Sequence, residues 1–318
     1  MKKVSFYCAI VFLSGCCVFA FLAYLIIPDQ SRFANNQIPE FALMNPGQTY
    51  CLNKQLITQS DQGFVDRFLS GNRSVYKNQV VAFKQNKQTI CSCFWFGTDK
   101  FGRDVLSRIV VGLRYTLIIG FASVVLSLII GLVLGGLAGF FGGRTDAFIS
   151  ILINVFWSLP TILLAFAIIL SFGRSFSSIF IAIALTMWGD VARLVRAQVL
   201  YYKEMLFVQA SKAMGFSEFR ILFKHIIPNL MGPVWVSAAG NFALAVLLES
   251  GLSFLGFGLQ PPIPSLGNIL QEQYSYAISG KPLLALIPSI VVVLLILSFQ
   301  VITAHLRDLT DVRMQEIR

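Results

Sequence analysis

Charged side chains are scarce in this sequence. Asp, Glu, Lys and Arg make up 13% of its 318 residues, while 56% are hydrophobic. Soluble domains carry about 25% charged residues, so this composition excludes an ordinary soluble enzyme or binding module. The mean hydropathy of +0.73 agrees with that exclusion and places the chain in a membrane.

Motifs of common catalytic sites are also absent. The sequence has no Gly-x-x-x-x-Gly-Lys-Ser/Thr loop, which would cradle nucleotide phosphates. It has no Gly-x-Ser-x-Gly elbow and no His-Glu-x-x-His helix. Neither His225 nor His305 has a metal-ligand neighbour in the sequence. We therefore expect no enzymatic activity, no catalytic residue, no metal site and no directly bound cofactor.

The six cysteines form two groups: Cys8, Cys16 and Cys17 in the first apolar run, and Cys51, Cys91 and Cys93 in a polar segment. The first group is typical of small apolar residues inside a helix bundle. In an oxidising compartment, Cys51 would form one disulfide with either Cys91 or Cys93. The spacing does not choose between these two partners.

Long apolar runs dominate the rest of the chain. Six of them can cross the roughly 30 Å hydrocarbon layer as helices, and they cover residues 4–27, 113–141, 148–172, 176–200, 227–256 and 282–305. The sequence therefore predicts an all-α fold, a polytopic bundle of six transmembrane helices. We expect four parts: a first transmembrane helix at 1–27, an external loop or small subdomain at 28–112 that ends in an amphipathic helix, a five-helix core at 113–305, and a cytoplasmic tail at 306–318.

Basic residues of the short loops indicate the orientation. Most of them fall on one side if both termini are cytoplasmic: Lys2, Lys3, Arg144, Lys203, Lys212, Arg220, Lys224, Arg307, Arg313 and Arg318. Only Arg174 and Lys281 lie in the short loops opposite. Cytoplasmic loops carry an excess of Lys and Arg, so the net charge of +10 reflects topology and requires no nucleic-acid partner.

The N-terminus allows a second interpretation. Leu13-Ser14-Gly15-Cys16 is similar to the lipobox of a cleaved bacterial lipoprotein signal. However, the apolar run continues to Ile27, which is longer than a signal-peptide core. We expect a retained first span.

The segment FGTDKFGRDVLSRIVVGLRYT, residues 96–116, has an apolar stripe at helical spacing: Phe101, Val105, Leu106 and Ile109. Opposite the stripe, three pairs have i,i+4 spacing: Asp99 with Arg103, Lys100 with Asp104, and Asp104 with Arg108. This pattern predicts an amphipathic helix on the lipid surface. Gly102 would cost about 1 kcal/mol inside such a helix, which indicates close packing or a bend.

A compact hairpin of two short helices is predicted at 207–229. Phe207, Ala210 and Met214 form an apolar edge on the first helix. Gly215 has the place of a left-handed residue that ends it, and Ser217 suits the N-cap of the second. Pro228 would close that second helix where the fifth span begins.

The surface of this hairpin would carry both apolar and basic side chains. We expect it to present Phe216, Phe219 and Leu222 beside Arg220 and Lys224. Such a knob fits a protein partner beneath the membrane. The alternative is an amphipathic helix that lies on the lipid.

Polar residues and prolines inside apolar runs are candidate functional positions. Pro160 should kink the third span, and it is either structural or part of a water-filled path. Glu249, deep in the fifth span, needs a partner in the bundle or a place on the translocation path. Asp190 and Arg193 have the spacing of an ion pair near Arg196.

Several of these segments resemble one family. VQASKAMGFSEFRILFKHIIPN (208–229) is similar to the EAA loop of binding-protein-dependent ABC importers. GTDKFGRDVLSR (97–108) and LSFLGFGLQPPIPSLG (252–267) resemble the patterns that flank the membrane core in the second permease subunit of the dipeptide/oligopeptide/nickel transporters. The Gly-Gly-Arg-x-Asp turn at 142–146 and Leu159-Pro160 are in register as well, so the resemblance covers roughly 97–306.

This resemblance implies a permease subunit of the bacterial cytoplasmic membrane with the importer fold, in which loop 201–226 couples to a cytoplasmic ATPase. The implied coupling residues are Gln209, Ala210, Ser211, Gly215, Phe216, Ser217, Phe219, Arg220 and Pro228. The implied family motif before the second span comprises Gly97, Thr98, Asp99, Gly102, Arg103 and Asp104. Pro160 and Glu249 are the candidates for the translocation path.

Two features depart from the family pattern. The usual loop glutamate aligns with Gln209 and its second alanine with Ser211. A glutamine cannot form a salt bridge, so we expect weaker or altered coupling. The outer loop at 28–96 is longer and more irregular than the pattern implies, and its cysteines lie outside the resemblance.

The implied function is uptake of oligopeptides or dipeptides, with nickel chelates or antimicrobial peptides as further substrates of the family. The implied partners are a second permease subunit, ABC ATPase subunits that use ATP, an extracytoplasmic solute-binding protein and the lipid bilayer. Two other classes stay open. A secondary transporter would show inverted repeats and intramembrane acids, and a membrane scaffold would use the hairpin as a docking site.

Overall fold

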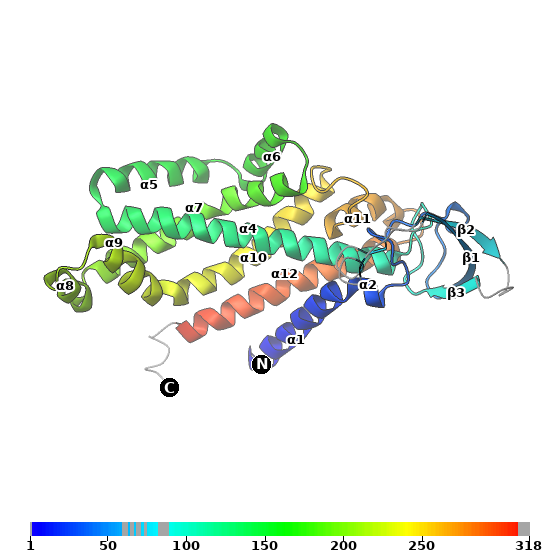
Figure 1. Ribbon diagram of the computed structural model, residues 1–318, viewed down its shortest axis with the longest axis horizontal. Helices are drawn as coiled ribbons and strands as arrows, with labels where there is room; N and C mark the ends of the chain where they lie inside the picture. The colour runs from blue at the N-terminus through cyan, green and yellow to red at the C-terminus, as the bar shows by residue number, and fades with distance from the viewer. Residues whose placement is uncertain are drawn as a thin grey trace. The chain divides into compact units, whose positions relative to one another are not determined.

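The computed structural model describes residues 2–58, 63, 67, 71, 72, 75–81 and 89–310. The chain forms two compact units: unit 1 comprises Met1–Val11, Ile118–Glu249 and Leu295–Arg318, and unit 2 comprises Phe12–Leu117 and Ser250–Leu294. The longest helices are α1 (Lys2–Phe21), α4 (Val105–Phe141), α7 (Phe176–Lys203), α10 (Met231–Phe254) and α12 (Leu283–Thr310). Figure 1 shows these helices with their labels.

Five helical segments of the described chain are long and apolar enough to cross a membrane, or six if one bent pair counts as a span. The bent pair is α5 (Gly143–Ser158) with α6 (Thr161–Phe172), which meet at 98°. Pro160, expected to kink a continuous helix over 148–172, instead lies between two separate helices, as the N-cap of α6. Proline has no N–H to donate and clashes with the preceding turn, so the chain breaks there (Figure 1).

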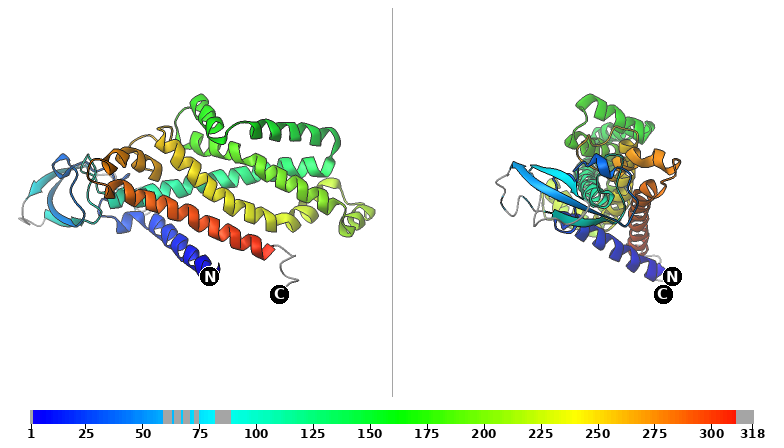
Figure 2. Two further views of the ribbon diagram at one scale, coloured as in Figure 1. Left: turned by 180° about the vertical axis from the view of Figure 1, so that it is seen from behind. Right: turned by 90° about the vertical axis from the view of Figure 1, so that its right-hand side faces the viewer.

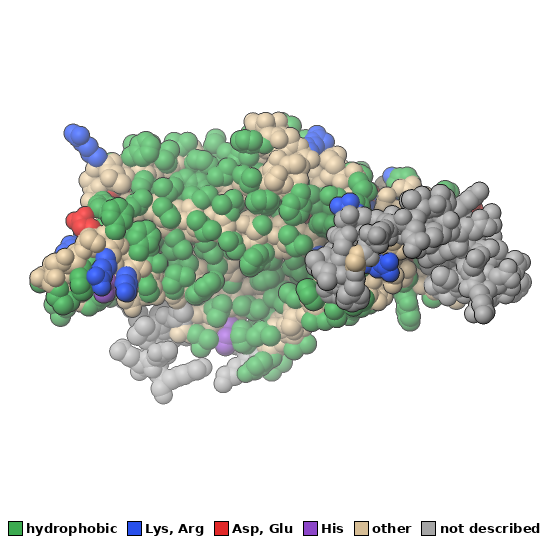
Figure 3. Space-filling model, viewed as in Figure 1, with side chains coloured by type: hydrophobic (Ala, Val, Ile, Leu, Met, Phe, Trp, Pro, Cys, Tyr) green, Lys and Arg blue, Asp and Glu red, His purple; other side chains and the backbone are tan. Residues whose placement is uncertain are grey.

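Hydrophobic side chains spread over the helices on the face seen in Figure 3, as expected for helices that contact lipid. Exposed examples on α5 and α6 are Phe148, Ile151, Val155 and Leu163. α1 passes through Leu13–Cys16 without a break. Residues 306–310, expected in the tail, continue α12, and 311–318 lie outside the described residues.

Unit 2 contains a sheet where an irregular loop is expected at 28–96. Strands β1 (Gln48–Thr58), β2 (Val75–Val81) and β3 (Thr89–Phe94) form an antiparallel sheet in the order β2-β1-β3 (Figure 2). Val, Ile, Thr and Tyr recur in these strands and favour the pleated surface. This sheet fits the small subdomain that was the alternative to a loop, and the irregular pattern ascribed to 28–96 overlooked short runs of β-branched residues between polar ones.

The sheet bears on the cysteine prediction. Cys51 is disulfide-bonded, and Cys93 is a free thiol. In the register between β1 and β3, Cys91 stands directly opposite Cys51. Short elements complete unit 2: α2 (Ala23–Ile26), a 3-10 turn at Pro39–Phe41, α11 (Leu266–Gln273) and a 3-10 turn at Tyr274–Ala277.

The amphipathic helix predicted at the end of 28–112 begins only at Val105, and a tight turn precedes it. Gly97 and Gly102 both have positive φ, at 76° and 71°. A Cβ at Gly102 would lie 1.8 Å from the carbonyl oxygen of Ile38, so no other residue fits. The close packing inferred for Gly102 is present, but in a turn rather than in a helix.

In unit 1, a row of glycines brings α4 against α7. Gly131, Gly135 and Gly139 recur every four residues on α4. A Cβ at Gly135 would lie 2.4 Å from the carbonyl oxygen of Ala192, and one at Gly131 would lie 2.5 Å from the Val191 side chain. Small residues at this spacing let two membrane helices approach closely.

Candidate coupling loop and motif cluster

The loop after α7 forms the predicted pair of short helices. α8 (Leu206–Ala213) has Met214 as its C-cap, and Gly215 follows with a φ of +77°. The Gly215 N–H donates to the Lys212 carbonyl at 2.9 Å, and the Phe216 N–H donates to the Ser211 carbonyl at 3.3 Å. These two bonds form a Schellman motif, which fixes the exit direction of the chain. α9 (Glu218–Arg220) then begins after Ser217, whose backbone is extended but whose side chain makes no capping bond.

Pro228 does not close the second helix, contrary to the sequence prediction. α9 continues through a π-helical segment at Ile221–Ile226 and a 3-10 segment at Ile227–Leu230 into α10. In the π-helical segment, the Ile227 N–H donates to the Leu222 carbonyl. Pitch changes of this kind accommodate a proline without ending a helix. Glu218–Phe254 is thus one continuous candidate span.

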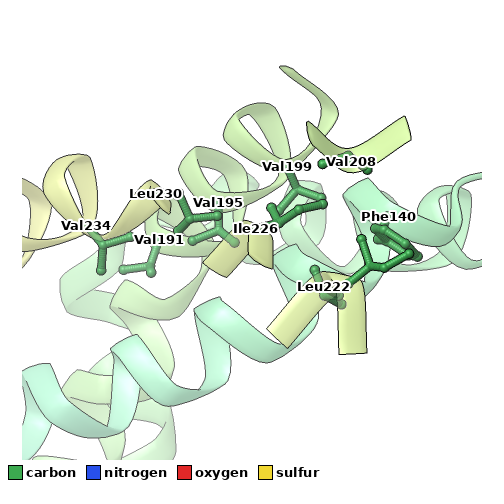
Figure 4. Packing of buried hydrophobic residues seen from close by; sticks show 10 residues of the cluster. Phe140, Val191, Val195, Val199, Val208, Leu222, Ile226, Leu230 and Val234 are labelled. Atoms are coloured by element: carbon green, nitrogen blue, oxygen red, sulfur yellow. The ribbon is translucent and has the colours of Figure 1, made fainter. Parts of the chain in front are cut away.

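One face of this loop is buried in a hydrophobic cluster of unit 1. The cluster joins α4, α7, α8 and the 221–234 segment through Phe140, Val191, Val195, Val199, Val208, Ile221, Leu222, Ile226, Leu230 and Val234 (Figure 4). Val208, Leu222 and Ile226 are fully buried. Burial of each such side chain contributes about 1.5–3 kcal/mol, so α8 and α9 are fixed firmly to α4 and α7.

The opposite face of the loop is exposed and apolar. Leu206 is 81% exposed, Met214 64% and Phe219 60%, and Phe207 and Phe223 also reach solvent. The predicted edge of Phe207, Ala210 and Met214 therefore points outward. Leu222, predicted to be presented to a partner, is buried instead.

Basic side chains border the exposed apolar face. Lys, Arg and acidic side chains gather around α8 and α9 in Figure 3. The Arg220 guanidinium lies 4.4 Å from the Phe216 ring centroid, and His225 stacks on the same ring at 5.6 Å. Cation–π contact and stacking hold these side chains in place.

Gln209 and Ser211 stand where the family pattern has other residues, and both hydrogen-bond to nearby backbone. Gln209 Nε2 donates to the carbonyl of Glu204 at 3.1 Å. Ser211 Oγ donates to the carbonyl of Phe207 at 2.8 Å, and Ser211 is buried. Both side chains thus stabilise α8 from within the loop.

In unit 2, the family motif before α4 forms a buried ion-pair cluster. Asp99 Oδ2 accepts from Arg103 Nε at 2.6 Å and from Arg108 Nη1 at 3.1 Å. Glu272 Oε2, on α11, accepts from the same two arginines at 2.5 Å each. The predicted Asp99–Arg103 pair is present, but it is buried rather than on a helix surface, and the predicted Asp104–Arg108 pair is replaced by these contacts.

Asp104 has a different role from Asp99. Its Oδ2 accepts from the Ser107 N–H at 2.9 Å and so caps the start of α4. Its Oδ1 is buried without a hydrogen-bond partner among the described residues. Thr98 is fully buried, and its Oγ1 accepts from the Met44 N–H at 2.8 Å while donating to the Phe41 carbonyl.

The pKa values of Asp104 and Glu272 shift in opposite directions. Burial raises the pKa of Asp104, against the opposing effect of its bonds from Ser107. Burial also acts to raise the pKa of Glu272, but the hydrogen bonds and charges of Arg108 and Arg103 outweigh it and hold that pKa below its usual range. Glu272 is therefore the ionised partner of the two arginines.

The candidates for the translocation path lie apart in the sequence and in different elements. Pro160 lies at the α5–α6 break, and Glu249 is fully buried in α10. The predicted Asp190–Arg193 ion pair is not formed: Arg193 stacks on Trp157 at 3.5 Å. Arg196 pairs with Asp146, with Nη2 donating to Oδ2 at 2.6 Å.

Sequence reasoning missed two features. Glu272 lies far from the motif in sequence, and no local pattern marks it. The glycine row of α4 is visible as three glycines at four-residue spacing in an apolar run. Among the side chains described, no group of three or more His, Cys, Asp or Glu could hold a metal ion.

Comparisons with known proteins identify the family of this chain. The family model for binding-protein-dependent transport system inner membrane components matches residues 131–311. The dipeptide transport system permease protein DppC of Alkalihalophilus pseudofirmus is 40% identical over 70% of this chain and 72% of its own length. The oligopeptide transport system permease protein OppC of Bacillus subtilis is 35% identical over 70% of this chain and 72% of its own length.

Among solved structures, an inward-facing form of the MetNI methionine ABC transporter matches with a TM-score of 0.48 and 21% identity, over 62% of this chain and 95% of that chain. The sequence relatives alone suffice for the assignment, since they cover more than two thirds of both chains. The chain belongs to the family of binding-protein-dependent transport system inner membrane components, as a multi-pass permease subunit of an ABC importer.

Proposed function

We propose that this chain carries peptides across the cytoplasmic membrane as one half of an ATP-driven translocation pathway. The observation that carries the proposal is the loop after α7, formed by α8, α9 and the 221–230 segment, which has one face buried against α4 and α7 and the other exposed. Relatives named as dipeptide and oligopeptide permeases support a peptide substrate. ATP hydrolysis belongs to a partner, since the sequence has no phosphate-binding loop.

The exposed face of the loop fits a protein groove. Leu206, Met214 and Phe219 offer an apolar ridge, and Arg220 and Lys224 border it with charge. Interfaces of this kind place apolar anchors at the centre and charges at the rim. We assign this ridge to a cytoplasmic ATPase subunit, with a second permease subunit and an extracytoplasmic solute-binding protein completing the complex.

The buried face explains how motion would pass through the loop. A force on α8 reaches α7 through Val199 and Val208, and it reaches α4 through Phe140 and Leu222, because these side chains share one packed cluster. Close-packed interiors transmit displacement rather than absorb it. Closure of the ATPase would therefore move α4 and α7, which the glycine row already holds together.

The proposed topology places both termini in the cytoplasm and counts α5 with α6 as one broken span. The excess of Lys and Arg on that side supports it. It predicts that Arg174→Cys reacts with a membrane-impermeant maleimide added outside cells and that Lys212→Cys does not, each measured against the parent chain. The opposite labelling pattern would reverse the orientation or remove α5–α6 from the count of spans, and labelling of both from one side would show that α7 does not cross the membrane.

The coupling role can be tested at Gly215. Gly215→Val opposes the left-handed backbone by roughly 1–2 kcal/mol, and a Cβ at this position meets nothing within 4 Å, so the effect is confined to the backbone. Gly280→Val is the matched control, since Gly280 also has positive φ, +84°, and open space around it.

We expect Gly215→Val to insert normally but to lose the ATPase on co-purification and to lose peptide uptake, while Gly280→Val keeps both. Equal behaviour of the two variants would exclude a special role for the loop. Uptake that survives removal of the ATPase but collapses with an uncoupler would favour a secondary transporter. Uptake unaffected by deletion of the chain would favour a scaffold.

A further inference from the structure

A small pocket in unit 2 has no part in the coupling just described. Its volume is ≈ 250 Å³, and it lies among the buried ion pairs, α11 and the loop before α11. Its lining consists of Arg103, Arg108, Gly256, Leu259, Gln260, Pro261, Pro262, Ile263, Asn268, Gln271 and Glu272. Gln260, Pro261 and Pro262 are exposed, whereas Arg103 and Arg108 are 4% and 3% exposed. The pocket therefore has an accessible rim and a buried cationic wall.

The cationic wall has more hydrogen-bond donors than acceptors. Each guanidinium carries five N–H donors. Arg103 makes three side-chain hydrogen bonds, to Asp99, Asn35 and Glu272, and Arg108 makes three, one to Asp99 and two to Glu272. The Nε of Arg108 is buried without an acceptor among the described residues. A ligand with acceptor oxygens would satisfy this excess.

The charges of the lining residues also favour a ligand with acceptor oxygens. Two cations, Arg103 and Arg108, line the pocket with one anion, Glu272, while the second carboxylate that pairs with both arginines, Asp99, is buried outside the lining. Glu272 Oε2 takes a short bond from each arginine, but its Oε1 accepts only from Arg108 Nη2 at 3.4 Å. The Glu272 side chain is 21% exposed, so it is the part of the cluster nearest to solvent. It occupies the place that a ligand carboxylate would take on a pair of guanidinium groups.

We propose that this pocket binds the C-terminal carboxylate of a peptide, in exchange for part of the Glu272 contact. The volume fits a terminal residue rather than a whole ligand, since pockets that enclose drug-sized molecules measure about 300–1,000 Å³. Leu259, Pro261, Pro262 and Ile263 supply apolar walls that do not select a particular side chain. Every unmodified peptide ends in a carboxylate, so the site recognises peptides independently of sequence. The inference rests on the proposed peptide transport.

Two substitutions should change the affinity of the pocket for a peptide carboxylate in opposite directions. Gln271→Glu adds a negative charge to the lining without removing an arginine contact, and it should weaken carboxylate binding about tenfold. Glu272→Gln removes the internal competitor and keeps the shape, so it should strengthen binding. Damage to the fold cannot produce such a gain. Ser279→Glu is the control for added charge, since Ser279 is exposed and outside the lining.

Binding is measured first, on the purified complex of permease and partner subunits, as the shift in melting temperature caused by N-acetyl-alanine and by N-acetyl-alanine amide. A ligand that binds only the folded state raises that temperature. We expect the acid to stabilise the parent complex, the amide to have no effect, and the shift by the acid to shrink with Gln271→Glu and to grow with Glu272→Gln. Equal effects of acid and amide, or a shift unchanged by Gln271→Glu, would overturn the carboxylate site.

Transport is measured second, as the ratio of initial uptake rates for tri-alanine and tri-alanine amide. Selection by the solute-binding protein is the same in every variant, so a change in the ratio belongs to the permease. Gln271→Glu should lower the ratio about tenfold, and Ser279→Glu should leave it unchanged. An equal loss for both peptides would assign the pocket to an acidic side chain of a docking protein and overturn the peptide assignment. A complex that takes up neither peptide, yet shows the acid-specific melting shift, would refute the proposed function and retain the carboxylate site.

Discussion

The side-chain amide of Gln209 donates a hydrogen bond to the backbone carbonyl of Glu204, with Nε2 and the oxygen 3.1 Å apart. An ionised glutamate has acceptors only and cannot make this bond. The glutamine at the position of the family's loop glutamate is thus adapted to its own surroundings. It links the start of α8 to the turn that follows α7, which is where the loop leaves the membrane helices.

Gln209→Glu should therefore loosen the loop rather than restore a lost function. We expect a loss of about 0.5–1.5 kcal/mol in the stability of the loop, seen as faster amide hydrogen exchange over 204–213, together with unchanged assembly. Gln209→Ala, which also removes the hydrogen-bond donor, should show the same faster amide exchange as Gln209→Glu. Higher transport with Gln209→Glu than with the parent chain would contradict this expectation and point to a contact with the ATPase.

The glycine row of α4 sets the distance to α7. Gly135→Leu should force the helices apart and destabilise unit 1 by about 1–3 kcal/mol, because its Cβ would meet the backbone of Ala192 at 2.4 Å. Gly251→Leu on α10 is the control, since a Cβ there meets nothing within 4 Å. We expect a lower melting temperature of the purified complex and weaker ATPase retention for Gly135→Leu alone. Equal melting temperatures for the two variants would show that α4 and α7 can separate without cost.

The two aspartates of the motif should respond differently to substitution by asparagine. Asp99 pairs with two buried arginines, so Asp99→Asn should cost about 3–5 kcal/mol. Asp104 bears a buried oxygen without a partner, and burial raises its pKa above the ordinary value of 3.8. Above the ordinary pKa, keeping this carboxyl group in the fold costs free energy, so Asp104→Asn should be neutral or stabilising there.

The pH dependence gives the sign of the Asp104 effect. A carboxyl group whose folded-state pKa is raised stabilises the fold at low pH, and this stability is lost as pH rises through the folded pKa. The stability of Asp104→Asn should therefore increase relative to that of the parent chain as pH rises from below 3.8 toward neutrality. The measurement is melting temperature against pH for both chains. If the melting temperature of Asp104→Asn fell relative to that of the parent chain as pH rose toward neutrality, Asp104 would be stabilised in its charged form.

The sheet of unit 2 should contain one defined disulfide. We expect it to join Cys51 to Cys91, because their Cα atoms are paired in the β1–β3 register and Cys93 is a free thiol. Peptide mapping under non-reducing conditions, after alkylation of free thiols, should recover the Cys51–Cys91 link with Cys93 alkylated. Cys93→Ser should leave the map unchanged, and recovery of a Cys51–Cys93 link would refute the assignment.

The sequence alone determined the membrane class, most of the spans and the end of the first loop helix. Apolar runs of sufficient length have no stable alternative to a spanning helix, since lipid offers no partner for backbone groups. Gly215 could be assigned from its place after an apolar edge, because a left-handed residue at a helix end is a local requirement. The three segments that resemble the importer family could likewise be recognised from the order of their residues alone.

Tertiary structure decided which side chains meet. The face that α8 buries, the continuation of α9 past Pro228 and the position of Leu222 depend on α4 and α7, which lie far away in the sequence. Asp99, Arg103 and Arg108 have the spacing of a surface helix, and they become a buried cluster because Gly102 turns the chain against Ile38 and because Glu272 completes the ion pairs. Buried charges are stable only with such partners, and no local pattern in the sequence specifies them.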